Sequence, residues 1–135
     1  MQRITTNKEI LYPELSYKIV GLVFNVQNEL GRFAREKQYA DLLEEQLKSE
    51  NIKYEREFRI GDSENIVDFL VGDKEKILLE LKTVRFLNRE HYRQLQNYLQ
   101  RTGVELGLLI NFSDVHLKPR RVLRLVQMDP SEYNE

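Results

Sequence analysis

Two acidic side chains and a lysine stand within stretches that otherwise have the composition of buried β-strands. Asp68 interrupts the apolar run 66–70, and a buried carboxylate is costly unless it is paired or binds a cation. Glu80 and Lys82 alternate with apolar residues over 77–82, so they lie on one face of the expected strand. With no histidine or cysteine nearby, two carboxylates suit Mg²⁺ or Mn²⁺ better than zinc. This combination predicts metal-assisted hydrolysis of phosphodiester bonds.

The pairing of these two strands decides whether the two carboxylates can meet. A two-residue loop between the strands would place Asp68 and Glu80 on opposite sides of the pair. A three-residue loop over 72–74 would instead pair Val71 with Glu75. In that register Glu80 is the diagonal neighbour of Asp68, at roughly 7 Å. We therefore expect the longer loop or a bulge.

Three further polar side chains are candidates to complete such a site. Glu36 lies three residues before Tyr39 and seven before Leu43, so it extends the inward stripe of an expected helix. A glutamate in a first turn can equally well complement the helix dipole. Gln94 and Tyr98 are four residues apart, on one face of a later helix. The alternative for this pair, which the spacing alone favours, is a helix edge that packs Tyr98 and exposes the amide.

The periodicity of the apolar residues predicts helices before and within a set of strands. We expect helices over 14–30, 35–49 and 88–100. Gly31 would end the first helix, Asn88 would cap the start of the third, and Gly103 would follow the end of the third. We expect strands over 54–60, 66–71, 76–82 and 106–112, and an edge strand over 122–126. The order α-α-β-β-β-α-β-β predicts the α/β class, with a mixed sheet flanked by helices. A single domain over 13–128 is expected between a loosely ordered lead-in at 1–12 and a tail at 129–135.

Composition excludes several classes of protein. The 135 residues are 41% hydrophobic and 32% charged, which suits a compact core under a charged surface. The absence of cysteine excludes disulfides, thiolate zinc sites and a cysteine nucleophile, and suits a cytoplasmic location. No apolar run approaches the roughly 20 residues of a membrane span, so we expect no membrane partner.

The charge balance limits how the chain could hold a polyanion. A formal net charge of −1 gives no global attraction to nucleic acid, so contacts with phosphates must be local. Basic side chains that follow the carboxylate pair are candidates for such contacts: Arg85, Arg89, Arg93, Lys118, Arg120, Arg121 and Arg124. The alternative for each of them is ordinary solvated surface.

The motifs in this order resemble a known family. They are Glu36-x-x-Tyr39, Val67–Val71, Leu79–Lys82, His91-x-x-Gln94-Leu95-x-x-Tyr98-Leu99 and Gly107–Phe112. Together, over about 15–124, they resemble the bacterial GxxExxY family, which is similar to the PD-(D/E)XK nuclease superfamily with its restriction-endonuclease-like core. Phe33 stands where that family's glycine is expected, and Val67 replaces the proline before the aspartate.

The resemblance implies a metal site. Asp68 and Glu80 would bind Mg²⁺ or Mn²⁺, with the backbone carbonyl of Leu81 as a further ligand. Glu36 would be the acid from a helix that completes the site and a candidate fourth ligand.

The resemblance also implies an activity. Lys82 would be the catalytic lysine, and Gln94 with Tyr98 would position DNA or water on the metal. The first hypothesis is therefore a Mg²⁺-dependent nuclease acting on DNA, with a homodimer or a protein partner extending its grip. The alternative is a catalytically silent module of the same fold that binds nucleic acid or a protein. A third interpretation treats the acids as salt-bridge partners of Lys82 without a metal.

Overall fold

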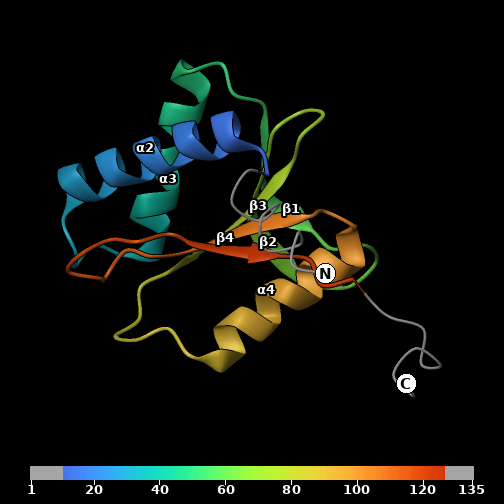
Figure 1. The fold of residues 1–135 in the computed structure, drawn as a ribbon. Coiled ribbons are helices and arrows are strands. Elements are labelled where there is room, and N and C mark those ends of the chain that lie inside the picture. The colour runs from blue at the N-terminus through green and yellow to red at the C-terminus, as the bar shows by residue number, and fades with distance from the viewer. Residues whose placement is uncertain (1–10, 127–135) are drawn as a thin grey trace.

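The computed structural model describes residues 11–126, whose arrangement Figure 1 shows. The elements in chain order are α2 (Pro13–Leu30), α3 (Glu36–Ser49), β1 (Tyr54–Arg59), β2 (Ile66–Val71), β3 (Ile77–Lys82), α4 (Arg89–Thr102), β4 (Leu106–Asn111) and β5 (Arg120–Leu123). This order confirms the predicted α/β fold. The expected lead-in at 1–12, apart from its last two residues, and the expected tail at 129–135 lie outside the described residues. No helix within 11–126 is long and apolar enough to cross a membrane.

The five strands form one mixed sheet in the order β1-β2-β3-β4-β5. Neighbouring strands run antiparallel except β3 and β4, which are parallel. Helix α4 makes the crossover between those two parallel strands, as a parallel connection requires. The carboxyl ends of β3 and β4 therefore meet at one edge of the sheet, and the loops that follow them begin there.

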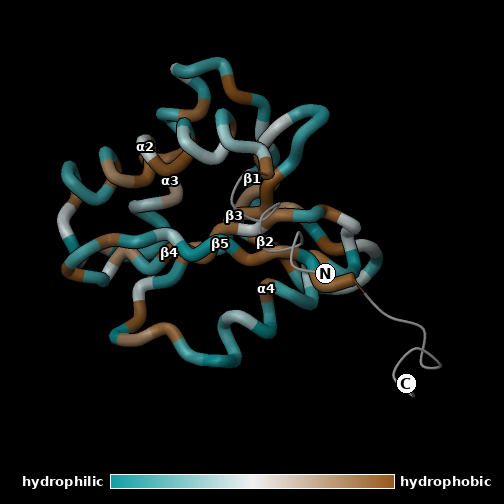
Figure 2. Tube along the Cα trace, in the orientation of Figure 1, coloured by the Kyte–Doolittle hydropathy of each residue, from teal (hydrophilic) through white to brown (hydrophobic). Residues whose placement is uncertain are grey.

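Helices cover both faces of the sheet (Figure 1). One apolar cluster joins α2 and α3 to one face, and it contains Ile19, Leu43 and Leu79. A second cluster joins α4 to the other face through Leu95 and Leu78. Figure 2 shows the hydrophobic residues concentrated along the strands between the helices. Every residue of β4 is buried, as expected of a strand that helices cover on both faces.

Local signals set the helix ends. Pro13 opens α2, and Gly31 follows its last residue with φ 80°, a value that suits glycine. The side chain of Asn88 accepts a hydrogen bond from the backbone N–H of His91, so Asn88 caps α4 as predicted. Gly103 ends α4 in the left-handed region with φ 77°.

The predicted three-residue loop between β2 and β3 is wrong. The connection covers 72–76, and Val71 pairs with Ile77 instead of Glu75. The physical reason is burial, because Ile77 is fully buried in the α2–α3 cluster while 73–76 are exposed. Gly72 makes the sharp turn with φ 112°, where an added Cβ would lie 1.9 Å from the backbone oxygen of Glu75.

The edge strand is present, but it begins two residues before the predicted 122–126. Strand β5 covers Arg120–Leu123 and pairs with β4 from Leu109 back to Leu106. Leu125 lies beyond the strand, where its N–H donates to the side chain of Gln96 on α4. Burial of Val122 in the α4 cluster sets this position.

Candidate functional site

The two carboxylates meet where the pairing of β2 and β3 ends. The last paired residues are Phe69 and Leu79, so Asp68 and Glu80 are the next across the gap. The N–H of Leu81 donates to Oδ2 of Asp68 at 2.6 Å, and the N–H of Asp68 donates to Oε1 of Glu80 at 3.3 Å. Each acid therefore satisfies a backbone donor that a regular ladder would have paired with a carbonyl. The register of these pairs sets Asp68 opposite Glu80, whereas the predicted register made the two residues diagonal neighbours.

The neighbouring strand is distorted beside Asp68. Arg56 pairs with Phe69 and Phe58 with Val67, and Glu57 between them has a left-handed backbone with φ 54°. Arg56 bonds to side chains of α3, whereas Phe58 packs into the α4 cluster. The alternation of side chains is therefore interrupted at Glu57, opposite Asp68.

A cleft of about 350 Å³ opens beside this break. Its wall is formed by α3, β1, β2 and β3, the last two being the strands that carry Asp68 and Glu80 (the acid pair). The wall consists of Glu36, Lys37, Ala40, Arg56, Glu57, Asp68 and Leu81. The prediction that Glu36 points toward the sheet is therefore consistent with its place in this cleft. Sequence reasoning missed Arg56 and Glu57, because only the packing of α3 against β1 places them beside Asp68.

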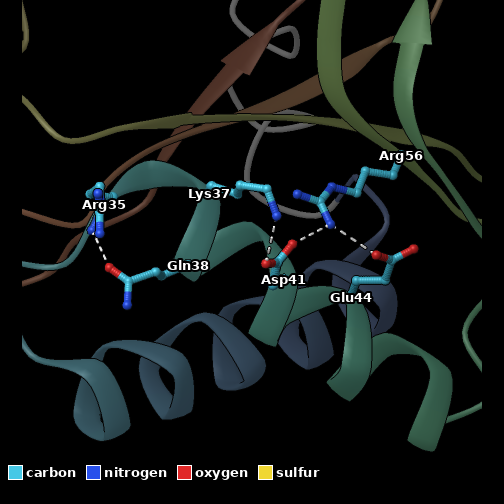
Figure 3. A network of polar contacts seen from close by, with 6 residues as sticks. All are labelled: Arg35, Lys37, Gln38, Asp41, Glu44 and Arg56. Atoms are coloured by element: carbon cyan, nitrogen blue, oxygen red, sulfur yellow. Dashed lines mark hydrogen bonds and ion pairs between the residues drawn. The ribbon is translucent and has the colours of Figure 1, made fainter.

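A polar network holds the first turns of α3 over β1 (Figure 3). The guanidinium of Arg56 lies 2.7 Å from Asp41 and 2.9 Å from Glu44, and Lys37 lies 3.1 Å from Asp41. Hydrogen bonds from Arg56 and then Lys37 hold the pKa of Asp41 below its ordinary value. Hydrogen bonds from Tyr54 and then Arg56 do the same for the pKa of Glu44. The network therefore sets the position of the helix end that carries Glu36.

Lys82 lies between the acid pair and α4. Its Nζ is 3.5 Å from Oε2 of Glu80 and donates to Oε1 of Gln94 at 3.2 Å. The predicted helix face thus reaches the site, although Gln94 itself is exposed and Tyr98 is buried, as the alternative interpretation required. Burial raises the pKa of Tyr98, and the charges of Glu80 and Asp68 raise it further.

Burial shapes the electrostatics of the acid pair. Glu80 is 6% exposed, and burial followed by the charge of Asp68 raises its pKa to about 8. Burial likewise raises the pKa of Asp68, with the Leu81 N–H and Lys82 acting in the opposite direction. The pKa of Glu36 is raised by burial and then by Asp68. The site therefore favours the uptake of positive charge at neutral pH, as a proton or as a cation.

The donor set fits a hard divalent cation. Residues 11–126 hold no group of three or more His, Cys, Asp or Glu side chains close enough to bind a metal. The side chains of Asp68 and Glu80 therefore offer two carboxylate ligands, and Glu36 lies in the wall of the same cleft as Asp68. Mg²⁺ is commonly held by one or two carboxylates, its other ligands being water and substrate phosphates. The oxygen-only pair is compatible with that ion and lacks the nitrogen or sulfur ligands typical of zinc.

The basic residues proposed as phosphate contacts separate into two groups. The structure contradicts the prediction for Arg121, because its guanidinium bonds to Ser16 and to the carbonyl of Leu11 and so joins β5 to α2. Arg124 has a buried Nε, and Arg93 lies 2.7 Å from Glu90. The remaining candidates are exposed: Arg85, Arg89, Lys118 and Arg120.

Asn111 is a buried polar residue whose structural role the sequence reasoning did not predict. It is 1% exposed at the end of β4. Its side chain bonds to both the N–H and the carbonyl of Val84 and donates to Asp114. The signal was available, because Asn111 interrupts the otherwise apolar run 106–112. Asn111 therefore connects the loops that follow β3 and β4.

Comparison with known proteins identifies the family. Residues 13–124 match the model of the PD-(D/E)XK nuclease superfamily. The chain belongs to this superfamily. Members generally use divalent metals, and the nuclease fold implies nucleic acid as the class of substrate. The narrower resemblance to the GxxExxY family stays a prediction.

Among solved structures, one described as "Crystal structure of SSO0001" is 20% identical, with a TM-score of 0.49, covering 81% of this chain and 68% of that one. No curated protein matches the chain significantly.

Proposed function

We propose that this member of the superfamily is a metal-dependent nuclease that hydrolyses phosphodiester bonds of DNA. The observation that carries the proposal is the burial of two adjacent carboxylates, Asp68 and Glu80, beside the ammonium of Lys82. Keeping two such acids together is unfavourable without a cation, and this suits a site built to take up a divalent ion.

Asp68 and Glu80 are the residues that would hold Mg²⁺ or Mn²⁺, with the carbonyl of Leu81 and the carboxylate of Glu36 as further candidate ligands. The metal supplies Lewis acidity and a lowered pKa of water. The N–H of Leu81, which donates to Asp68 Oδ2, orients that carboxylate before any ion binds.

Lys82 would act on the water and on the phosphate. An ammonium has three N–H donors, and its contacts with Glu80 and Gln94 account for two of them. The third can donate to the attacking water or to the oxygen on which charge grows in the transition state. Gln94 has a positioning role in this scheme, since it bonds to Lys82 from α4. Tyr98 is part of the apolar cluster between α4 and the sheet.

A catalytically silent module is the second candidate, and one observation favours it. Within residues 11–126 no third acidic side chain comes close enough to complete a group of three. Such a module would keep the fold and bind nucleic acid or a protein partner without cutting. Calorimetric titration with Mn²⁺ separates the two candidates, because the module has no need of metal and the nuclease requires it.

Cleavage assays test the proposal directly. The full chain is mixed with plasmid and single-stranded DNA in Mg²⁺ or Mn²⁺, beside Lys82→Ala, Asp68→Asn and the control Lys76→Ala. Lys76 is an exposed lysine in the β2–β3 connection, just before the first residue of β3. Loss of a group that stabilises transition-state charge lowers the rate by about 10²–10³-fold, so we expect that loss for Lys82→Ala and full activity for Lys76→Ala. Equal cleavage by wild type and Lys82→Ala would contradict the proposal.

A further inference from the structure

Two exposed phenylalanines, each beside an arginine, stand in the loops that precede α3 and α4. The side chain of Phe33 is 88% exposed and that of Phe86 is 73% exposed. The guanidinium of Arg32 lies 4.9 Å from the ring centre of Phe33, and that of Arg85 lies 5.7 Å from the ring centre of Phe86. Figure 2 shows a hydrophobic stretch within the β3–α4 connection, which contains Phe86. Two separate loops therefore present the same pair, an aromatic ring and a cation.

The loop before α3 is held in place from both sides. The hydroxyl of Tyr39 accepts a hydrogen bond from the N–H of Ala34 at 3.2 Å and donates to the carbonyl of Gly31. Nε of Arg32 donates to the carbonyl of Ser113 at 3.1 Å, which ties the loop to the β4–β5 connection. Phe33 therefore extends from a loop whose backbone is fixed.

The loop before α4 is tied to that same β4–β5 connection. Asn111 bonds to the N–H of Val84 at 3.0 Å and to its carbonyl at 2.8 Å, and it donates to Asp114 at 3.0 Å. Figure 1 shows the α2–α3, β3–α4 and β4–β5 connections along one side of the molecule, at the left of the view. A ring presented by a fixed loop binds with a smaller loss of entropy than one on a mobile loop.

Each ring lies close along the chain to a residue of the candidate site. Phe33 is three residues before Glu36, which shares the cleft with Asp68, and Phe86 is four residues after Lys82. Helices α3 and α4 cover opposite faces of the sheet, so the loops that carry the two rings lead into helices on opposite faces. The segments 31–35 and 83–88 contain three arginines and no acid, in a chain of net charge −1.

We propose that Phe33 and Phe86 are stacking platforms for unpaired nucleobases, and that the substrate of this site is single-stranded nucleic acid. An unpaired base offers its face to an aromatic ring, whereas the faces of bases in a duplex are covered by their neighbours. Arg32 and Arg85 supply the cations that attract the phosphates joining those bases. The inference rests on the proposed nuclease function, and it names the substrate class of that site.

Binding measurements on the full chain test the platforms. A fluorescein-labelled 15-nucleotide single strand and the matching duplex are titrated in EDTA, with fluorescence anisotropy as the readout. Each of Phe33→Ala and Phe86→Ala should weaken single-strand binding by about 5- to 50-fold and leave duplex binding unchanged. The leucine variants of both positions keep the apolar volume without the ring face, and they should lose most of the same affinity. Tyr17→Ala is the matched control, because Tyr17 is an 81% exposed aromatic residue on α2.

A double-mutant cycle separates stacking from contact with the backbone. Replacing the bases of the single strand by abasic sites should weaken wild-type binding, and the phenylalanine substitutions should then have no further effect. Thermal unfolding of each variant checks that the exposed substitutions leave the fold unchanged. Single strands that bind Phe33→Ala and Phe86→Ala as tightly as wild type, or a duplex that binds wild type as tightly as the single strand, would overturn the inference.

Cleavage distinguishes failure of this inference from failure of the proposed function. If wild type cuts DNA above the Lys82→Ala control, with no preference for single strands and no effect of the phenylalanine substitutions, the platforms are refuted and the nuclease remains. If single-strand binding depends on the rings and no cleavage occurs with Mg²⁺ or Mn²⁺, the platforms are supported and the nuclease is refuted.

Discussion

Replacing Glu80 by glutamine should stabilise the metal-free protein. The pKa of Glu80 rises from the ordinary 4.5 to about 8 in the folded state, because the carboxyl is buried and lies beside Asp68. Because the folded state binds this proton more tightly than the unfolded state, the resulting contribution to the free energy of unfolding is full below pH 4.5. It is lost progressively as the pH rises from there to about 8. At pH 7 the glutamate is ionised in the unfolded chain and largely protonated in the folded one, and this proton uptake costs up to about 3 kcal/mol of stability relative to low pH. A neutral amide of the same shape avoids that cost.

Loss of the contact with Lys82 offsets part of this gain. Nζ of Lys82 lies 3.5 Å from Oε2 of Glu80, and both side chains are largely buried. We therefore expect Glu80→Gln to raise the free energy of unfolding by about 1–3 kcal/mol at pH 7. If the acids were only salt-bridge partners of Lys82, the same substitution would lower that free energy by about 3–5 kcal/mol. The metal-site and salt-bridge interpretations thus predict changes of opposite sign in the free energy of unfolding.

Urea unfolding in EDTA at pH 5, 6, 7 and 8 measures this difference. Wild type should lose stability across this series, and Glu80→Gln should lose less of it, because only Asp68 of the buried pair still titrates in that variant. Glu45→Gln, which replaces an exposed acid on α3, should follow wild type. Added Mn²⁺ should then stabilise wild type more than Glu80→Gln, because binding to the folded state alone adds stability. A metal-free Glu80→Gln protein less stable than wild type at pH 7, or one with an unchanged pH slope, would refute the reasoning.

Three further substitutions or conditions follow from the structure. Gly72→Ala should lower the free energy of unfolding by about 2 kcal/mol or more, since φ is 112° and the new Cβ would meet the backbone of Glu75; equal urea midpoints would contradict this. Arg56→Met should destabilise the protein near pH 7 and have a smaller effect below about pH 4. The reason is that Asp41 and Glu44, whose pKa values are lowered, interact favourably with Arg56 only while they are ionised. An effect that does not depend on pH would contradict a stabilising role for this network. Mn²⁺ affinity, measured by calorimetry, should increase as the pH rises toward 8, because Glu80 must lose its proton to bind the ion, and a pH-independent affinity would argue against it as a ligand.

Local patterns were sufficient to predict the elements and to single out the candidate residues of the site. Asn88 and Gly103 mark the ends of α4 in the sequence as they do in the structure, because capping depends on neighbouring residues. The shared face of Glu80 and Lys82 follows from the alternation within one strand, and their 3.5 Å contact confirms it. A carboxylate inside an apolar run was enough to single out Asp68.

The register of β2 and β3 could not be predicted in the same way. Gly72 and Asp73 indicate a turn, but they do not set its length. The fully buried position of Ile77 under α2 and α3 decides that Val71 pairs with it, and this brings Asp68 directly across from Glu80. Register therefore depended on which side chains the distant helices cover.

The sequence by itself thus determined which side chains are chemically suited to the site, whereas the tertiary structure decided which of them lie together there. The α3 network around Arg56 brings Glu36 to the cleft with Asp68, and the bonds of Arg121 to α2 remove it from the candidate phosphate contacts. Residue type and spacing report local preference, which acts over a few positions along the chain. Contacts between elements form only when burial selects one packing among several, and a single strand or helix does not contain that information.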